Sequence, residues 1–597
     1  MTPLDPRKPY KPLDLGNGIV SGTLAPNGRW LSLGIAHPIH GRVELTTAPP
    51  FTGDRFVQAA VRAYRAELAD PRRLSFGFDL LDFAASSVWL DEDSFPHAVV
   101  DRSQGRFEVT TVAPDGRAGA VQLLRIEARA HIDGPSWDGA IRLSRAEYTQ
   151  LTPGGPLPAA PSANRSGLDG AVFWIDDRAL EAAAAIAQSD PVIIDPGADA
   201  RVVLAIALAG TRGAAIAEAT ALAREGEELV AAAVEQRRKL WTGCDVASEI
   251  QRPIRKGTGY ALDCAASRLV PNLDGPWSRE LGTVAVLADH QILPLVWTRD
   301  AYYVCRALLS IAPRDAATDR LMSGFVDWLF GVAAGPWWGR ALLANGKAKD
   351  RQFQLDQQIY PPLLVADWGR TTDRPRLDDR RSECDQVIEG LLARRSEHGL
   401  IATEETPGDD PLVQPFHFSS HVLLWHLLDV FDHPAAGEVR DATLRHFTSA
   451  GRFAYAIAGP DGAGARHYHD ANDLPTVFAP GWGFCAADDP RWRATIDFAW
   501  SPANEAYFAG ALSGLGSVHT PHPWPLGDLQ EIVVARVTQD PERERRAKAR
   551  LERVETWDGM LPEAYDETSG AVASRHWFAW PAALRALLDR EPMLTAP

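Results

Sequence analysis

The spacing of apolar residues divides the chain into two parts with different periods. Before about residue 210, short apolar runs alternate with polar positions and are separated by turn residues. GIVSGTL (18–24) and RWLSLGI (29–35) are joined through the Asn-Gly pair of APNG, and the runs at 107–113 and 120–132 flank PDG. Further runs of this kind lie at 43–48, 171–175, 191–195 and 201–210. Short strands separated by such turns are typical of an antiparallel sandwich, so we predict an N-terminal antiparallel β-sandwich.

From about residue 213 the apolar residues recur with a helical period. The stretch 213–241 is rich in Ala and Glu and contains no proline, which predicts a long linking helix. Later helical segments lie at 301–312, 321–333, 419–431, 525–537 and 577–589. A sandwich, a linking helix and a set of helix pairs occur in that order in several glycosidases and phosphorylases. We therefore predict a multidomain α and β protein: a β-sandwich at 1–212, a helical linker at 213–245 and a C-terminal (α/α)6 toroid at 246–597.

Charge and cysteine content narrow the class of protein. The net charge of −17 and the pI of about 5.4 disfavour nucleic acid as a partner, because an acidic chain repels phosphate backbones. No apolar run approaches the length needed to span a bilayer, so we expect no membrane partner. The first residues have no apolar core of signal-peptide length, and the 5 cysteines are scattered. We expect a cytoplasmic location. The oligomeric state stays open.

Three carboxylates are candidate site residues. Asp300 follows Trp297 and Arg299 directly before a predicted helix, so it is either a helix cap or part of a sugar-binding group. Asp356 stands in QLDQQIYPP, several residues before the prolines that we expect to open a helix; that is early for a cap. Glu563 in MLPEAY is either a surface residue or a catalytic one.

Other patterns carry weaker alternatives. The His467, His469 and Asp470 loop suggests a metal site only faintly, because no helical or cysteine-rich partner motif stands near it. A phosphate loop at Gly514 and Gly516 is rejected, since neither glycine-rich phosphate motif is present. The 19 tryptophans concentrate after residue 240. Most are expected to fill cores, and some to stack on the apolar faces of sugar rings.

Five segments between about 285 and 590 occur in an order and spacing that resemble one enzyme family. They are VWTRDA, FQLDQQIYP, DGAGARHYHDANDLPTVFAPGWGF, GLGSVHTPHPWPL and GMLPEAY…SRHWFAW. Together they resemble the metal-independent exo-α-1,6-mannosidases of glycoside hydrolase family 125. The first 240 residues look instead like the sandwich that precedes the toroid in bacterial glucoamylase-like enzymes.

The resemblance implies an inverting glycosidase without metal or other cofactor. It places the general acid at Asp356 and the general base at Glu563. An inverting enzyme uses one carboxylic acid at the leaving oxygen and one carboxylate that activates water on the opposite face of the sugar. The matched positions imply that the substrate is bound by Trp297, Arg299, Asp300, Gln357, Asp470, Asn472, His519, Trp524, Arg575 and Trp577.

The leading prediction is an exo-acting α-glycoside hydrolase that releases a terminal sugar, most plausibly α-mannose, from a small α-linked oligosaccharide. An α-glucosidase of glucoamylase or isomaltose-hydrolysing type is the second candidate. A phosphorylase is disfavoured by the negative charge of Glu563, and a non-catalytic sugar-binding protein by the presence of both carboxylates. The motifs leave linkage and chain length open.

Overall fold

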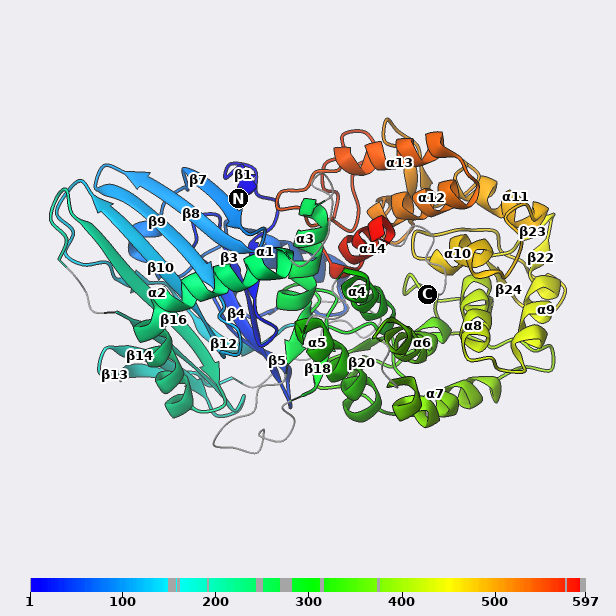
Figure 1. The fold of residues 1–597 in the computed structure, drawn as a ribbon, viewed down its shortest axis with the longest axis horizontal. Coiled ribbons are helices and arrows are strands. Elements are labelled where there is room, and N and C mark those ends of the chain that lie inside the picture. The colour runs from blue at the N-terminus through cyan, green and yellow to red at the C-terminus, as the bar shows by residue number, and fades with distance from the viewer. Residues whose placement is uncertain are drawn as a thin grey trace.

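The structure is a computed structural model that describes residues 2–148, 157, 162–189, 193–242, 251–268, 282–311, 316–372, 376–574 and 577–590. Within these residues, two large antiparallel sheets are followed by a mainly helical part (Figure 1). The nine-stranded sheet comprises, in spatial order, β1 (Thr2–Leu4), β7 (Ser87–Asp91), β8 (Phe95–Arg102), β9 (Gly105–Val112), β10 (Gly119–Ala128), β16 (Asp199–Ala209), β15 (Ala182–Gln188), β14 (Val172–Asp177) and β13 (Arg165–Asp169). The five-stranded sheet comprises β12 (Arg142–Arg145), β5 (Gly41–Thr46), β4 (Trp30–His37), β3 (Val20–Leu24) and β2 (Leu13–Gly16).

The predicted hairpins are confirmed. Strands β3 and β4 pair with Val20 opposite Ile35, and β9 pairs with β10. Gly28 and Gly116 in the two turns have φ of 84° and 72°, values that glycine adopts without steric cost. Of the run at 191–195, residues 191 and 192 lie outside the described residues, and Ile194 forms an isolated bridge to Ile132.

The two sheets share one hydrophobic core. Leu33 and Val43 of the five-stranded sheet belong to the same buried cluster as Val100 and Leu124 of the nine-stranded sheet. The predicted long helix is present as α2 (Arg212–Thr242). It lies along the nine-stranded sheet (Figure 1) and buries Leu222 and other apolar residues against β10 and β16.

The helical part has its own core. Its helices are α3 (Gln251–Tyr260), α4 (Thr298–Ile311), α5 (Ala316–Asp327), α6 (Leu355–Thr372), α7 (Arg376–Leu392), α8 (Phe418–Val430), α9 (Ala436–His446), α10 (Leu474–Trp482), α11 (Pro490–Ala499), α12 (Pro525–Val537), α13 (Pro541–Arg553) and α14 (Ala579–Arg590). Short strands between them include β17 (Ala266–Arg268), β18 (Val284–Val286), β19 (Ala341–Leu342), β20 (Ala348–Asp350), β21 (Phe416–His417), β24 (Ala456–Ile457), β25 (Tyr507–Phe508), β26 (Gly514–Ser517) and β27 (His522–Pro523). The chain is thus a mixed α and β multidomain protein.

One helix in the first part was missed by the sequence prediction. Helix α1 (Gln58–Ala69) lies between β5 and β7 and buries Val61, Tyr64 and Leu68, which are spaced three and four residues apart. Tyr64 and Leu68 pack into the core of the helical part, not into the core between the sheets. The alternating apolar runs before and after α1 indicated strands, so the helical spacing of its apolar residues was not recognised.

The prediction that Pro361 or Pro362 opens a helix is wrong, because α6 begins at Leu355 and both prolines lie inside it. A proline lacks the N–H that bonds the carbonyl four residues earlier. The carbonyl of Gln357, which loses its donor at Pro361, instead accepts a hydrogen bond of 2.6 Å from Thr298 Oγ1. A tertiary contact that the local sequence does not show therefore replaces the missing bond.

The helix-cap alternative for Asp300 is corrected. Helix α4 begins at Thr298, so Asp300 lies within its first turn and does not precede it. The N-cap of α8 is His417, which accepts from the backbone N–H of Ser420. No helix among the described residues is long and apolar enough to cross a membrane. The predicted domain limits stay a prediction; residues 243–250, at the second limit, lie outside the described ones.

A buried charge cluster joins the sheets to the helical part. Lys11 Nζ lies 2.6 Å from carboxylate oxygens of both Asp14 and Asp558, and Lys256 Nζ lies 3.3 Å from Asp558. All four residues are buried. Burial acts to raise the pKa of Asp558, but Lys11 and Lys256 together bring it well below its ordinary value.

We expect Asp558→Ala to lower the free energy of unfolding by about 3–5 kcal/mol, because it leaves two buried lysines with Asp14 as the one remaining carboxylate of the cluster. The control is Arg129→Ala, whose ion pair with Asp101 is exposed and should be worth at most about 1 kcal/mol. Urea unfolding measures both. Equal losses in the two variants would contradict a structural role for the buried cluster.

Candidate active site

Most of the predicted site residues meet at one cavity of about 900 Å³ in the helical part. Those that line it are Trp297, Arg299, Asp300, Asn472, His519, Trp524 and Glu563. Asp356, Gln357, Asp470 and Trp577 are buried behind or beside this wall. Arg575 lies outside the described residues.

Arg299 organises the closed end of the cavity. Its Nη1 donates to Asp356 Oδ2 at 3.0 Å, its Nε lies 3.5 Å from Asp300, and its Nη2 lies 3.7 Å from Asp409. Burial would lower the pKa of Arg299, but Asp356 and the other two carboxylates raise it above its ordinary value. The other oxygen of Asp356, Oδ1, is buried and has no hydrogen-bond partner among the described residues. An unpartnered buried oxygen of this kind calls for a functional explanation.

Gln357 holds the start of α4 in place. Its Oε1 accepts from Thr298 Oγ1 and from the backbone N–H of Arg299, and its Nε2 donates to the carbonyl of Arg340. These bonds engage both polar atoms of the side chain within the protein, and Gln357 is fully buried. They place Arg299 by capping the helix that carries it.

A second acidic group lies behind the cavity wall at Asp470 and Asp473. Asp470 accepts from Asn472 Nδ2 at 2.6 Å and from the Tyr468 hydroxyl at 2.7 Å. Asn472 thereby presents a fixed amide to the cavity. Burial raises the pKa of Asp473 to about 8 and lowers the pKa of the adjacent His417 to about 4.

Glu563 enters the cavity from the loop before α14. The Ser574 hydroxyl donates to its Oε2 at 2.6 Å. His519 faces the same space: its Nδ1 lies 3.2 Å from Asp410. Burial would lower the pKa of His519, but the bond to Asp410 and the nearby charge of Glu563 raise it to about 9. A protonated histidine therefore stands beside two carboxylates near neutral pH.

Sequence reasoning missed the loop that carries Glu405, Asp409 and Asp410, all of which line the cavity. Glu405 accepts from Arg340 Nη1 at 2.9 Å and from Gln354 Nε2 at 3.2 Å. Burial raises the pKa of Glu405 to about 7. The run TEETPGDDP was the available signal, but acidic surface turns have the same composition.

The aromatic walls differ in part from the prediction. Trp297 and Trp524 line the cavity, as do Phe578 and Trp580. Trp577 instead packs in the interior, with Lys11 Nζ 4.8 Å from the centre of its ring. Two residues of the predicted SRHWFAW segment thus face the cavity in place of its first tryptophan.

Among the described residues, no cluster of possible metal ligands includes His467 or His469. The weak metal hypothesis therefore gains no support there. His469 Nε2 bonds Gln530 at 2.9 Å. Of the described side chains, His522, Asp566 and Glu567 have ligand atoms within 4.8 Å of one another. His522 already pairs with Glu567 at 2.9 Å, which accounts for their closeness without an ion.

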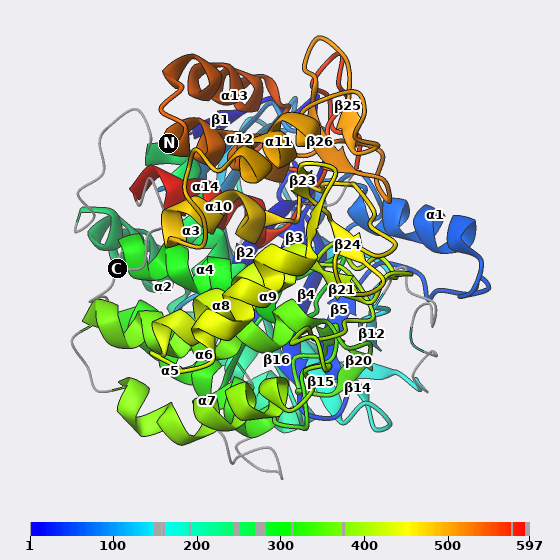
Figure 2. The same cartoon turned by 90° about the vertical axis from the view of Figure 1, so that its right-hand side faces the viewer.

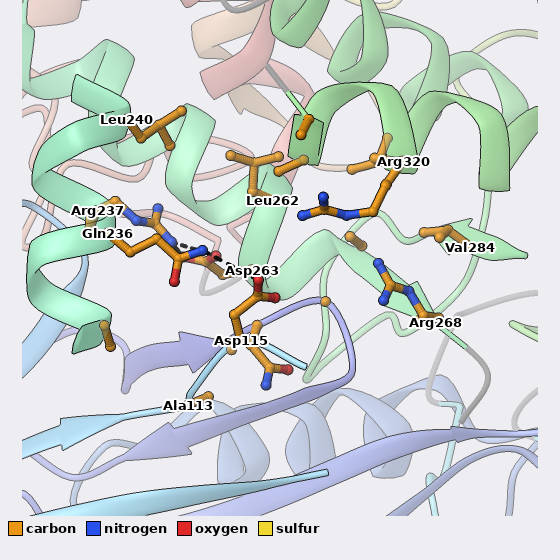
Figure 3. Close-up of a pocket in the computed structure, with 18 of the residues that line it drawn as sticks. Ala113, Asp115, Gln236, Arg237, Leu240, Leu262, Asp263, Arg268, Val284 and Arg320 are labelled. Atoms are coloured by element: carbon orange, nitrogen blue, oxygen red, sulfur yellow. Dashed lines mark hydrogen bonds and ion pairs between the residues drawn. The ribbon is translucent and has the colours of Figure 1, made fainter. Parts of the chain in front are cut away.

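A second cavity of about 920 Å³ lies at the junction of α2 with β17 and β18 (Figure 3). Arg237 and Asp263 join across it by hydrogen bonds of 2.6 Å, and Arg268 and Arg320 also line it. It contains none of the predicted site residues. The carboxylates and aromatic rings of the first cavity make that cavity the candidate active site.

The chain is similar to known proteins both in a family model and in its overall fold. Residues 389–587 match the family model of the metal-independent α-mannosidases, GH125. A bacterial glucoamylase complexed with acarbose is 12% identical, with a TM-score of 0.58 over 97% of this chain and 93% of that one. A putative kojibiose phosphorylase from the human microbiome is 9% identical, with a TM-score of 0.56 over 98% and 88% of the two chains.

A metal-independent α-mannosidase of Streptococcus pneumoniae, in a non-productive complex with α-1,6-mannobiose, is 19% identical. Its TM-score is 0.48, over 57% of this chain and 93% of that one. A search of curated protein sequences gives no match. The matches to the glucoamylase and the phosphorylase include both the sheets and the helices, so each shares its fold with nearly the whole of this chain.

The cavity is lined by aromatic rings, by the amide of Asn472 and by several carboxylates. The protein is a glycoside hydrolase, and residues 389–587, about a third of the chain, match the family model of the metal-independent α-mannosidases, GH125. The resemblance predicted from the sequence is thus confirmed. The matched range contains Asn472, His519 and Glu563, whereas the segments of Asp300 and Asp356 lie before it.

Proposed function

We propose that the protein is an inverting, exo-acting α-glycoside hydrolase that releases one terminal sugar from small α-linked saccharides. The observation that carries this proposal is the pairing of two carboxylates around one cavity. Glu563 lines the cavity, and Asp356 lies buried behind its closed end, bonded to Arg299, which lines it. Inverting glycosidases place two carboxyl groups on opposite sides of the sugar, about 6.5–9.5 Å apart, to leave room for water.

In the proposed reaction Asp356 gives its proton to the glycosidic oxygen as the bond to the anomeric carbon breaks. Glu563 takes a proton from the water that attacks this carbon from the other face. Ser574 holds the Glu563 carboxylate by its hydrogen bond. Trp297, Trp524 and Trp580 offer apolar faces for sugar rings, and Asp300, Asn472 and His519 offer polar contacts.

Mannose is the first candidate for the released sugar, because the GH125 family model covers the loops of Asn472, His519 and Glu563. Glucose is the second, because the fold matches a glucoamylase over nearly the whole chain. The same likeness supports a β-sandwich at 1–212, a helical linker at 213–245 and an (α/α)6 toroid at 246–597. Arg575, Asp470, Gln357 and Trp577 remain proposed supports of the site, and the cytoplasmic location stays a prediction.

Glu405 is a second candidate for the proton donor. It lines the cavity directly, whereas Asp356 does not. Its pKa of about 7 suits a group that must hold a proton near neutral pH. Asp356 is favoured by the resemblance of its segment, and Glu405 by its environment, so the two assignments call for separate tests.

We expect Asp356→Asn and Glu563→Gln each to lower kcat by about 10²–10⁴-fold on an α-linked disaccharide, because each removes a proton-transfer group. On 2,4-dinitrophenyl α-mannoside or glucoside, whose leaving group needs no proton, Asp356→Asn should recover much of this loss and Glu563→Gln should not. Asp378→Asn, an exposed aspartate on α7, is the control. Activity of either variant within a few-fold of wild type would refute its assigned role.

The assignment of Glu405 as the proton donor predicts that kcat/KM falls on the basic side of its pH profile. Its carboxyl group is protonated below its pKa of about 7, so activity that needs this proton falls as the pH rises through that value. Glu405→Gln carries no titrating proton and should not show this decrease. A wild-type profile that is flat from pH 6 to 8, or an unchanged decrease in the variant, would exclude Glu405 from the reaction.

A further inference from the structure

Helix α1 comes from the sheet-rich part of the chain but forms a wall of the catalytic cavity. Gln58, Arg62, Arg65 and Ala66 line the cavity, together with Arg55 and Phe56 just before the helix. Positions 58, 62 and 65 are spaced four and three residues apart and share one helix face. Figure 2 shows α1, in blue, beside the loops of the helical part.

The wall is fixed in place by contacts on its other face. Tyr64 and Leu68 are buried in the core of the helical part. Gln291 Nε2 donates to the carbonyl of Leu68 at 2.6 Å, and the Tyr64 hydroxyl donates to the carbonyl of Pro49 at 2.8 Å. The residues that face the cavity are therefore carried on a packed helix.

The arginines on this wall make no direct bond to a carboxylate. Within the described part of the chain, no hydrogen bond or ion pair holds the side chains of Arg55, Arg62 or Arg65. The other two arginines of the cavity, Arg299 and Arg340, are both paired with carboxylates. Burial and the charge of Arg62 lower the pKa of Arg65, and the charges of Glu563 and Asp289 act to raise it. Arg55, Arg62 and Arg65 have no hydrogen-bonded acid among the described residues, so their N–H donors can bind an anionic ligand.

The arginines lie toward the open end of the cavity. Phe56 is 63% exposed and Arg62 is exposed, whereas Arg299 and Asp300 are at most 5% exposed. In an exo-acting enzyme the released sugar occupies the closed end, so the rest of the substrate points outward. This step rests on the proposed function.

We propose that α1 and Phe56 bind the part of the substrate beyond the cleaved bond, and that this part carries a carboxylate or phosphate. Arg62 and Arg65 donate hydrogen bonds to the anion, since guanidinium groups match the geometry of both. Phe56 offers an apolar surface beside them. The net charge of the chain, −17, repels anions in general, so an anionic substrate requires a local positive cluster of this kind.

The test uses two aryl glycosides that differ in one charge: the 4-carboxyphenyl α-glycoside and its methyl ester, with mannose or glucose as the sugar. The measured quantity is the ratio of kcat/KM for acid over ester. A hydrogen bond to a charged group is worth about tenfold in binding, so Arg62→Gln and Arg65→Gln should each lower the ratio by about tenfold. Both substrates are measured with the same variant, so a partial loss of folded enzyme lowers both kcat/KM values equally and leaves their ratio unchanged.

Two further variants separate charge from structure. Arg65→Lys keeps the charge and should keep more of the preference than Arg65→Gln. Arg72→Gln removes an equal charge just after α1 from an exposed residue that does not line the cavity, and it should leave the ratio unchanged. An unchanged ratio in the Arg62→Gln and Arg65→Gln double variant would overturn the proposal.

Inorganic phosphate distinguishes the two sources of an anion. Phosphate that competes with the carboxylate substrate, and does so more weakly in Arg65→Gln, supports the proposed site. Alternatively, phosphate accelerates turnover and appears in a sugar 1-phosphate product. That result would mean that the arginines bind an attacking phosphate, and it would overturn the proposal. If wild type cleaves neither glycoside, the proposed function fails. Calorimetric binding of the acid against the ester then still decides whether the arginines hold an anion.

Discussion

The buried charge of Arg299 is the constraint on which the active site depends. A guanidinium group removed from water is tolerated only when carboxylates surround it. Asp300 on α4, Asp356 on α6 and Asp409 on a loop meet this need together. Three segments far apart in the chain are therefore tied to one point, and the position of Asp356 follows from its bond to Arg299.

The first turns of α4 and α6 hold Arg299 and Asp356 in position. The prolines inside α6 leave the carbonyl of Gln357 without its helical donor, and Thr298 at the start of α4 takes that place. The side chain of Gln357 caps the same helix through the N–H of Arg299. The two helices are thus joined where they carry Arg299 and Asp356, which gives the acidic segment a rigid support.

Patterns local in sequence predicted much of this molecule. Turn residues located the hairpins around Gly28 and Gly116, and the helical period located α2 and α12. The bonds of Gln357, the start of α6 and the environment of Glu405 depend on contacts between distant segments, which no local pattern encodes. Helix α1 was missed although its period is visible, because strands surround it. Ordered motifs predicted which loops meet at the cavity, but not which tryptophan of the last motif faces it.

The two parts of the chain act as one unit. Lys11 and Asp558 join them through buried charge, and α1 brings arginines from the first part to the cavity of the second. The first part of the chain therefore contributes α1 to the wall of this cavity.

The central claim is that two carboxylates direct water to the anomeric carbon with inversion. Proton NMR of the first sugar released from an α-linked substrate by wild-type enzyme tests it most directly. The account predicts that the β-anomer appears first and then equilibrates with the α-anomer. Initial release of the α-anomer would show retention and contradict the assignment of Asp356 and Glu563 as acid and base.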